Sequence, residues 1–291
     1  MKFQVIYTLL FLSVTVIVLQ SLSGGAAANG LGDRTGSPIG GAAGCSCHGG
    51  GAFSPTISVV VKDAALNTVT EYIPGASYSL EFSVAASAGT PAGYGFQALA
   101  ISASNNSNAG SMTSVSSANT QITNFGGRQY AEHLGINPSG IFTVNWTAPA
   151  AGFGSVNLYS RGLAVNGSSS SGDQQTSSNL LTLSEQTSIS YAASSYCSGA
   201  SNPLPTLIGI QNGLFSAQPT GLSIVPSTGL VDVSNSQTGQ IYTIIYTYNG
   251  SDTTTTQITI NATDDPSFSY SASNYCQAEN DPFPSITGLF G

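Results

Sequence analysis

Charged side chains are scarce in this chain. Only 6% of its 291 residues are Asp, Glu, Lys or Arg, against about 25% in ordinary soluble domains. Five Lys and Arg stand against 13 Asp and Glu, so the net charge is −8 and there is no basic patch. A surface without clustered positive charge does not attract phosphate backbones, so the composition argues against nucleic-acid binding.

Helical periodicity is also missing. From Pro55 onward apolar residues alternate with polar or small ones, as in "SYSLEFSVAA" (77–86) and "FTVNWTAP" (142–149). Gly, Pro, Asn and Ser separate these runs, which is the pattern of a sandwich of antiparallel strands. We therefore predict an all-β fold with a first β-sandwich over residues 55–186. Trp146 should lie in its core with its indole N–H bonded.

Only one long apolar run is present, and it lies at the N-terminus. Lys2 precedes an apolar stretch over residues 3–19, and residues 26–28 are three alanines. This is the pattern of a secretory signal peptide with its small-residue cleavage site. The run has about 17 residues, which is short for a membrane span. We predict a signal peptide over 1–28, a mature chain that starts near Asn29 without a transmembrane segment, and an extracellular or cell-surface location.

Cysteine and histidine are rare but clustered. Residues 29–54 are rich in Gly and Ala, so we expect an exposed arm that carries "CSCH". Cys45, Cys47 and His48 resemble the haem-attachment pattern C-x-x-C-H with one residue missing between the thiols. The second histidine of the chain is His133.

Four alternatives stay open for this cluster. It could attach a covalent haem c, with His48 and His133 as axial ligands. It could bind Zn or Cu through the thiolates of Cys45 and Cys47 and the imidazoles. The two cysteines could close a tight disulfide or carry no ligand, and His133 could be an ordinary packed residue.

The C-terminal third contains an internal repeat. "SYAASSYCSGASNPLPTLIG" (190–209) matches "SYSASNYCQAENDPFPSITG" (269–288) at a constant offset of 79 residues. This period suits an Ig-like module. We predict one module over 187–266, with a hairpin turn at Asn249-Gly250, and the truncated start of a second over 267–291. The chain should then be part of a longer multi-module protein.

Other polar residues give weaker signals. The equivalent cysteines of the repeats are Cys197 and Cys276, and their pairing cannot be read from the sequence. Four acids near the module junction could bind Ca²⁺ or be solvated linker residues, namely Asp252, Asp264, Asp265 and Asp281. Arg161 and Asp173 are expected to form a solvated surface pair.

No nucleophile elbow, phosphate loop or recurring carboxylate pair is present, so we predict no enzymatic activity.

Several segments together resemble a known family. They are "DRTGSPIGGAAGCSCHGG" (33–50), "YAEHLG" (130–135) and "FTVNWTAPAAGFGSVNLYSRGLAVNG" (142–167). In this order they resemble the bacterial choice-of-anchor V domain, which is similar to the Reelin N-terminal (Reeler) β-sandwich. The resemblance covers about residues 33–184. It implies a Cys-x-x-Cys-His-like element in the N-terminal arm and a histidine at the position of His133. The repeats resemble Ig-like modules of secreted surface proteins in Bacteroidota.

Two functional hypotheses follow. The first is a secreted cell-surface scaffold for adhesion or extracellular matrix, whose uncharged surface contacts polysaccharide or cell-surface components weakly at many points. The second is an extracellular haem- or metal-binding redox or electron-transfer protein that uses Cys45, Cys47, His48 and His133.

Overall fold

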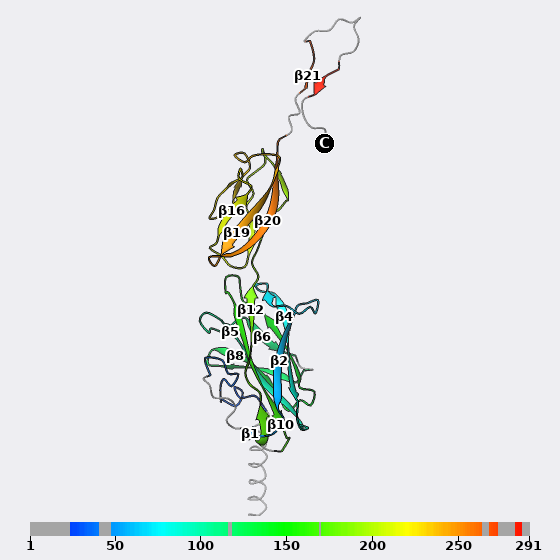
Figure 1. The fold of residues 1–291 in the computed structure, drawn as a ribbon, viewed down its shortest axis with the longest axis vertical. Helices are drawn as coiled ribbons and strands as arrows, with labels where there is room; N and C mark the ends of the chain where they lie inside the picture. The colour runs from blue at the N-terminus through cyan, green and yellow to red at the C-terminus, as the bar shows by residue number, and fades with distance from the viewer. Residues whose placement is uncertain are drawn as a thin grey trace, which may run out of the picture. The chain divides into compact units, whose positions relative to one another are not determined.

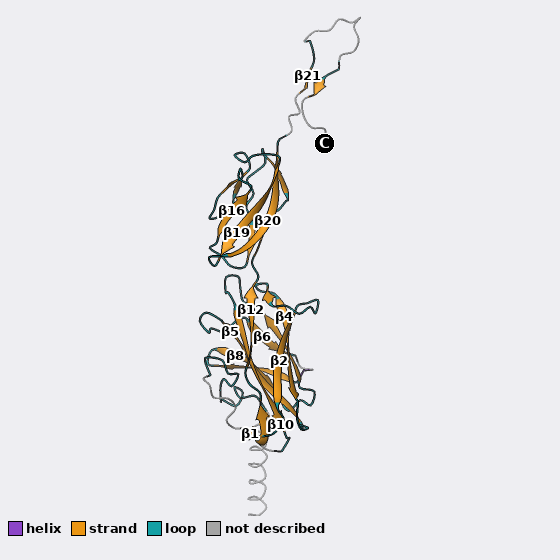
Figure 2. Cartoon of the chain, in the orientation of Figure 1, coloured by secondary structure: helices purple, strands orange, loops and turns teal. Residues whose placement is uncertain are grey.

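The chain is represented by a computed structural model, which describes residues 24–40, 48–115, 118–168, 170–263, 268–272 and 283–286. These residues are all-β, with no α-helix among them (Figure 2). They fall into two compact units, Met1–Thr187 with Ile208–Ile210, and Ser188–Leu207 with Gln211–Gly291 (Figure 1). In the part of the chain that is described, no helix is long and apolar enough to span a membrane.

Two sheets form the first unit. Its strands are β1 (Gly49–Gly50), β2 (Pro55–Lys62), β3 (Glu71–Tyr72), β4 (Ser77–Ala86), β5 (Gly93–Ser102), β6 (Ser111–Ser114), β7 (Thr120–Phe125), β8 (Arg128–His133), β9 (Ile141–Thr147), β10 (Val156–Val165), β11 (Ser171–Gln175) and β12 (Asn179–Glu185). The larger sheet has the order β1-β11-β10-β5-β8-β7, with β12 beside β10 and β3, and the smaller has the order β2-β4-β9-β6.

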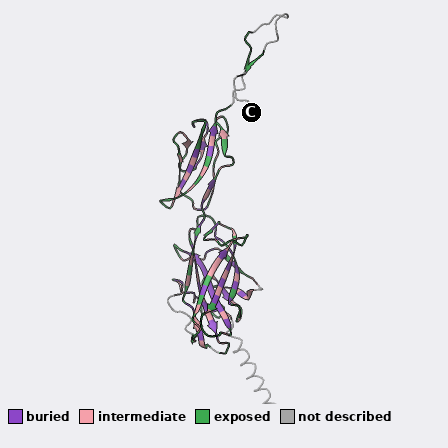
Figure 3. Cartoon of the chain, turned by 45° about the vertical axis from the view of Figure 1, so that its right-hand side comes forward, coloured by how far each residue is buried: buried purple, intermediate pink, exposed green. Residues whose placement is uncertain are grey.

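The apolar residues of the predicted alternating pattern form the core of this sandwich. Along β4 and β9 every second side chain is buried. Figure 3 shows buried residues alternating with less buried ones along strands of the first unit. Phe142 of β9 stacks on Phe96 of β5 with ring centroids 4.4 Å apart, which joins the two sheets. Trp146 is fully buried, and its indole N–H donates to the Ala109 carbonyl at 2.9 Å. Both predictions for Trp146 are therefore confirmed.

Residues 24–40, here called the N-terminal segment, cover the other face of the larger sheet. Ala27 and Ile39 pack with Leu99 of β5 and Tyr130 of β8 in a second apolar cluster. Nearly all of β5 is buried as a result, because both of its faces are covered. We expected an exposed arm over residues 29–54, and this was wrong for residues 32–37, four of which are buried. Besides Ala27 and Ile39, the attachments of the N-terminal segment are backbone and small polar groups, which leave no hydrophobic periodicity in the sequence.

A smaller sandwich forms the second unit. Its strands are β13 (Ser188–Ser190), β14 (Ser195–Cys197), β15 (Thr206–Ile208), β16 (Leu214–Gln218), β17 (Ser223–Ile224), β18 (Val231–Asp232), β19 (Gln240–Tyr248) and β20 (Asp252–Asn261). They form the sheets β14-β20-β19-β16, β13-β15 and β17-β18. The predicted hairpin turn joins β19 to β20, and both Asn249 and Gly250 have positive φ, 47° and 85°.

The second repeat begins as the first does. β21 (Phe268–Ser269) pairs antiparallel with β22 (Ser285–Ile286). At the repeat offset these residues correspond to β13 and β15, which also pair. The described fragments of the second copy thus repeat the opening strand pair of the module.

The proposed calcium site at the module junction does not include Asp252. This residue begins β20 at the hairpin turn, and Asn261 ends the strand. Ten residues of strand span about 30 Å, so Asp252 lies at the opposite end of the module from the segment that follows β20. Asp264, Asp265 and Asp281 lie outside the described residues, as do Cys276 and the apolar run over residues 3–19.

Candidate functional site

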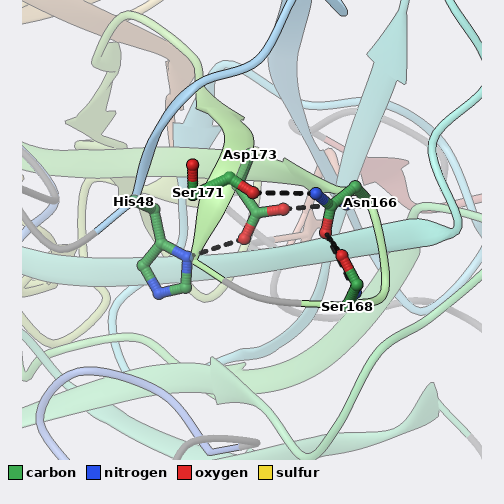
Figure 4. Close-up of polar contacts among 5 residues, drawn as sticks. All are labelled: His48, Asn166, Ser168, Ser171 and Asp173. Atoms are coloured by element: carbon green, nitrogen blue, oxygen red, sulfur yellow. Dashed lines mark hydrogen bonds and ion pairs between the residues drawn. The ribbon is translucent and has the colours of Figure 1, made fainter.

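His48 is held by a buried carboxylate. Its Nδ1 atom lies 2.8 Å from Oδ2 of Asp173, as Figure 4 shows. The Asp173 side chain is 3% exposed and the His48 side chain 29%. In the tautomer with a proton on Nδ1, the ring donates to Asp173 and its Nε2 atom carries a free lone pair. The pair therefore presents an oriented nitrogen ligand at the edge of the sandwich.

The local fold fixes both partners. β1 pairs in parallel with β11, which brings the residues after His48 alongside Asp173 although the two are 125 positions apart. The backbone N–H of Asn166 donates to the second carboxylate oxygen of Asp173 at 2.8 Å. The Asn166 side chain donates to the Ser171 carbonyl and accepts from Ser168, which closes the loop around the carboxylate (Figure 4). Asp173 is thus positioned before any ligand binds.

His133 is anchored in a similar way. Its Nδ1 atom lies 3.0 Å from the carbonyl oxygen of Phe96. A Cβ added at Gly95 would lie 2.9 Å from the His133 ring, so glycine at that position makes room for the imidazole. The same Nδ1 atom also lies 3.1 Å from the backbone N–H of Phe96, which donates to it in the other tautomer. In the tautomer in which Nδ1 donates to the Phe96 carbonyl, Nε2 of His133 is the atom that can bind a ligand.

Burial lowers the pKa of the His133 imidazole, and the charge of His48 lowers it further. The hydrogen bond to the Phe96 backbone and the Glu132 carboxylate act in the opposite direction, but the pKa remains below its ordinary value. His133 is therefore neutral at pH 7, the form that binds metals.

Both histidines belong to one face of the larger sheet. Gly95, which lies against the His133 ring, is opposite Leu163 of β10, and Leu163 is opposite Gln175 of β11. Asp173 precedes Gln175 by two residues, so it points to the same face as Gln175. Two strand spacings, about 10 Å, separate β5 from β11.

The cysteines of the predicted cluster lie outside the described residues. Cys45 and Cys47 lie in residues 41–47, which are not described, although Cys47 directly precedes His48 in the chain. Among the described residues no three His, Cys, Asp or Glu side chains form a group that could hold a metal ion. Cys197, the one cysteine in the described ranges, is an exposed free thiol of the second unit.

Two buried acids of the first unit were missed or misassigned from the sequence. The predicted surface pair of Arg161 and Asp173 was wrong, because Asp173 is buried against His48 and Arg161 contacts Gln175 at 3.5 Å. Glu132, next to His133, is fully buried. It was missed because two of its three donors are backbone amides of the N-terminal segment, and the third is the side-chain amide of Gln97. The sequence did contain one indication that Glu132 is buried, because an acidic residue stands inside the strand segment "YAEHLG".

No family model and no curated protein matches the chain. Among solved structures it is similar to the reeler domain of human F-spondin, with 23% identity over 52% of this chain and 99% of that chain and a TM-score of 0.34. It is also similar to BcpA, the major pilin subunit of Bacillus cereus (11% identity, 72% and 69% coverage, TM-score 0.29). A third is the N-terminal Ig1-2 module of the Drosophila receptor protein tyrosine phosphatase DLAR (12% identity, 72% and 98% coverage, TM-score 0.20). The similar structures are therefore Reeler, pilin and Ig domains.

Proposed function

We propose that this chain is a secreted, non-enzymatic surface protein of the choice-of-anchor V type, and that its first unit binds one Zn²⁺ ion through Cys45, Cys47, His48 and His133. The anchoring of the two histidines carries this proposal. Each ring is held at Nδ1, by a carboxylate for His48 and by the backbone carbonyl and N–H of Phe96 for His133, and zinc binding selects the tautomer in which His133 donates to the carbonyl. Metal-binding histidines in proteins are oriented by these same partners, which leave Nε2 for the ion.

The donor set favours zinc over haem. Two thiolates and two imidazoles make the tetrahedral set that Zn²⁺ prefers, and four protein ligands make a closed, structural site. Covalent haem attachment uses two residues between the cysteines, whereas only Ser46 separates Cys45 from Cys47. A zinc ion here would fix the chain between the N-terminal segment and β1. This proposal replaces the redox role with a structural one.

Metal analysis of the secreted protein tests the proposal. We expect one zinc per chain by elemental analysis, and visible absorption from Co²⁺ substituted for zinc, because tetrahedral thiolate–cobalt complexes are coloured. Cys45→Ser should lose both signals. Cys197→Ser is the matched control, since it removes an exposed thiol of the other unit. Metal-free wild-type protein, equal signals in both variants, or a Soret band of covalent haem would contradict the zinc site.

A second candidate function concerns the second unit. The outward positions of its four-stranded sheet carry no charged residue. They are occupied by hydroxyl, amide, thiol and aliphatic side chains, namely Ser195, Cys197, Leu214, Ser216, Gln218, Ile241, Thr243, Ile245, Thr247, Thr253, Thr255, Gln257, Thr259 and Asn261. A face of this chemistry suits hydrogen bonding to neutral polysaccharide. We infer that it supports adhesion or matrix assembly, in which repeated weak contacts add up.

A charge placed on that face should weaken polysaccharide binding. Thr255 is exposed at the centre of β20. We expect Thr255→Glu to reduce retention of the chain on immobilised neutral polysaccharide several-fold, because a carboxylate loses hydration against a neutral partner. Ser227→Glu, in an exposed turn outside the sheet, is the control. Equal retention of the two variants, or no retention of the wild type, would count against this function.

A further inference from the structure

The N-terminal segment is tied to the first unit by a buried carboxylate. Glu132 on β8 is fully buried. Its Oε1 accepts the N–H of Ala27 at 2.7 Å and the side-chain amide of Gln97 at 2.9 Å, and its Oε2 accepts the N–H of Ala28 at 3.0 Å. Two of its three donors therefore belong to the three-alanine run that the sequence places inside the signal peptide.

Residues before these alanines are part of the same arrangement. Gly24 forms an antiparallel bridge with Leu134, directly after β8. Gly25 is buried against Glu132, and a Cβ added there would lie 2.2 Å from the carboxyl carbon. The Asn29 side chain donates to the carbonyls of both glycines, at 2.8 and 2.9 Å. The contacts that hold the N-terminal segment on β8 thus include Gly24 itself.

Cleavage after Ala28 would remove this arrangement. Glu132 would lose two of its three donors while its carboxyl group stays buried, which is strongly unfavourable. Asn29 would lose both of its glycine acceptors. A secreted protein that starts at Asn29 is therefore inconsistent with the packing of the first unit.

One cleavage position upstream preserves every contact. Signal peptidases require small residues at the last and third-last positions of the signal, and Ser23 and Ser21 satisfy this before Gly24. We propose that a signal peptidase hydrolyses the Ser23–Gly24 bond, so that the mature chain begins at Gly24 and the Glu132 carboxylate holds its first turn. Water supplies the hydroxyl of the new Ser23 carboxyl group, and the Gly24 nitrogen takes the proton and becomes the new terminal amine.

The first residue of the secreted protein tests this proposal. The full chain should be expressed in a bacterial host that secretes it, and the product examined by intact mass and N-terminal sequencing. We expect Gly24 as the first residue. Any other start, or an unprocessed chain, would overturn the proposal.

Two tyrosine substitutions sharpen the test. Ser23→Tyr places a bulky residue just before the proposed cleavage and should leave a precursor that is not released. Ala28→Tyr places the same residue at an exposed position and keeps the backbone N–H that Glu132 accepts, so processing at Gly24 should be unchanged. If Ala28→Tyr blocks processing and Ser23→Tyr does not, the cleavage lies after Ala28 and the proposal is wrong.

Discussion

Asp173→Asn is expected to weaken zinc binding by the first unit by about 10- to 100-fold, the usual effect of losing the group that orients a metal-bound histidine. The new amide can still accept the N–H of Asn166 through its oxygen, so the loop should persist. Its NH₂ group then faces Nδ1 of His48. An imidazole that accepts at Nδ1 carries its proton on Nε2, the atom that must bind the ion. The substitution changes the tautomer while it preserves the shape of the site.

Competition with a zinc chelator measures this effect as a change in dissociation constant. Glu185→Gln is a suitable control, because Glu185 is another buried carboxylate of the first unit that accepts backbone N–H groups, those of Gly152 and Gly154. It should destabilise the unit somewhat without changing the affinity for zinc. An unchanged dissociation constant in Asp173→Asn would show that Asp173 does not orient a metal ligand. An equal loss in both variants would assign the effect to stability.

The sandwich could be predicted because the sequence patterns that indicate its strands and turns each involve only a few neighbouring residues. Alternation along β4 and β9 identifies the buried face of each strand, and the Asn249-Gly250 turn fixes one hairpin. These patterns follow from strand geometry and turn stereochemistry, which act over a few residues. The all-β class and the burial of Trp146 follow from the same kind of signal.

The polar contacts of the site could not be predicted, because they join distant parts of the chain. Asp173 meets His48 across 125 positions, and Glu132 meets Ala27 across 105. The N-terminal segment binds largely through backbone N–H groups, which every residue except proline possesses. Its Gly- and Ala-rich sequence therefore looks the same whether it is packed or exposed. His48 and His133 could be named as candidates, but not their anchors.

Glu132→Gln is expected to lower the free energy of unfolding of the first unit by about 3 kcal/mol, since hydrogen bonds to a charged group contribute about 1.5–3 kcal/mol each. A carboxylate accepts the Ala27, Ala28 and Gln97 donors with two oxygens. Glutamine has one oxygen, and its NH₂ group would point at a donor that is already buried. For a unit of this size the melting temperature should fall by roughly 6–12 °C.

Glu81→Gln is the matched control for this measurement. Glu81 pairs with Lys62 at 3.0 Å, and both side chains are about one-third exposed. A pair this exposed contributes about 1 kcal/mol at most, so its loss should change the melting temperature little. Amide hydrogen exchange adds a local readout, because faster exchange at Ala27 and Ala28 in Glu132→Gln would locate the loss in the N-terminal segment. If the two variants have the same melting temperature, and the amides of Ala27 and Ala28 stay protected from exchange, Glu132 does not hold the N-terminal segment. The Gly24 start would then lose its energetic basis, whereas the zinc site, which depends on Asp173 and the Phe96 carbonyl, would be unaffected.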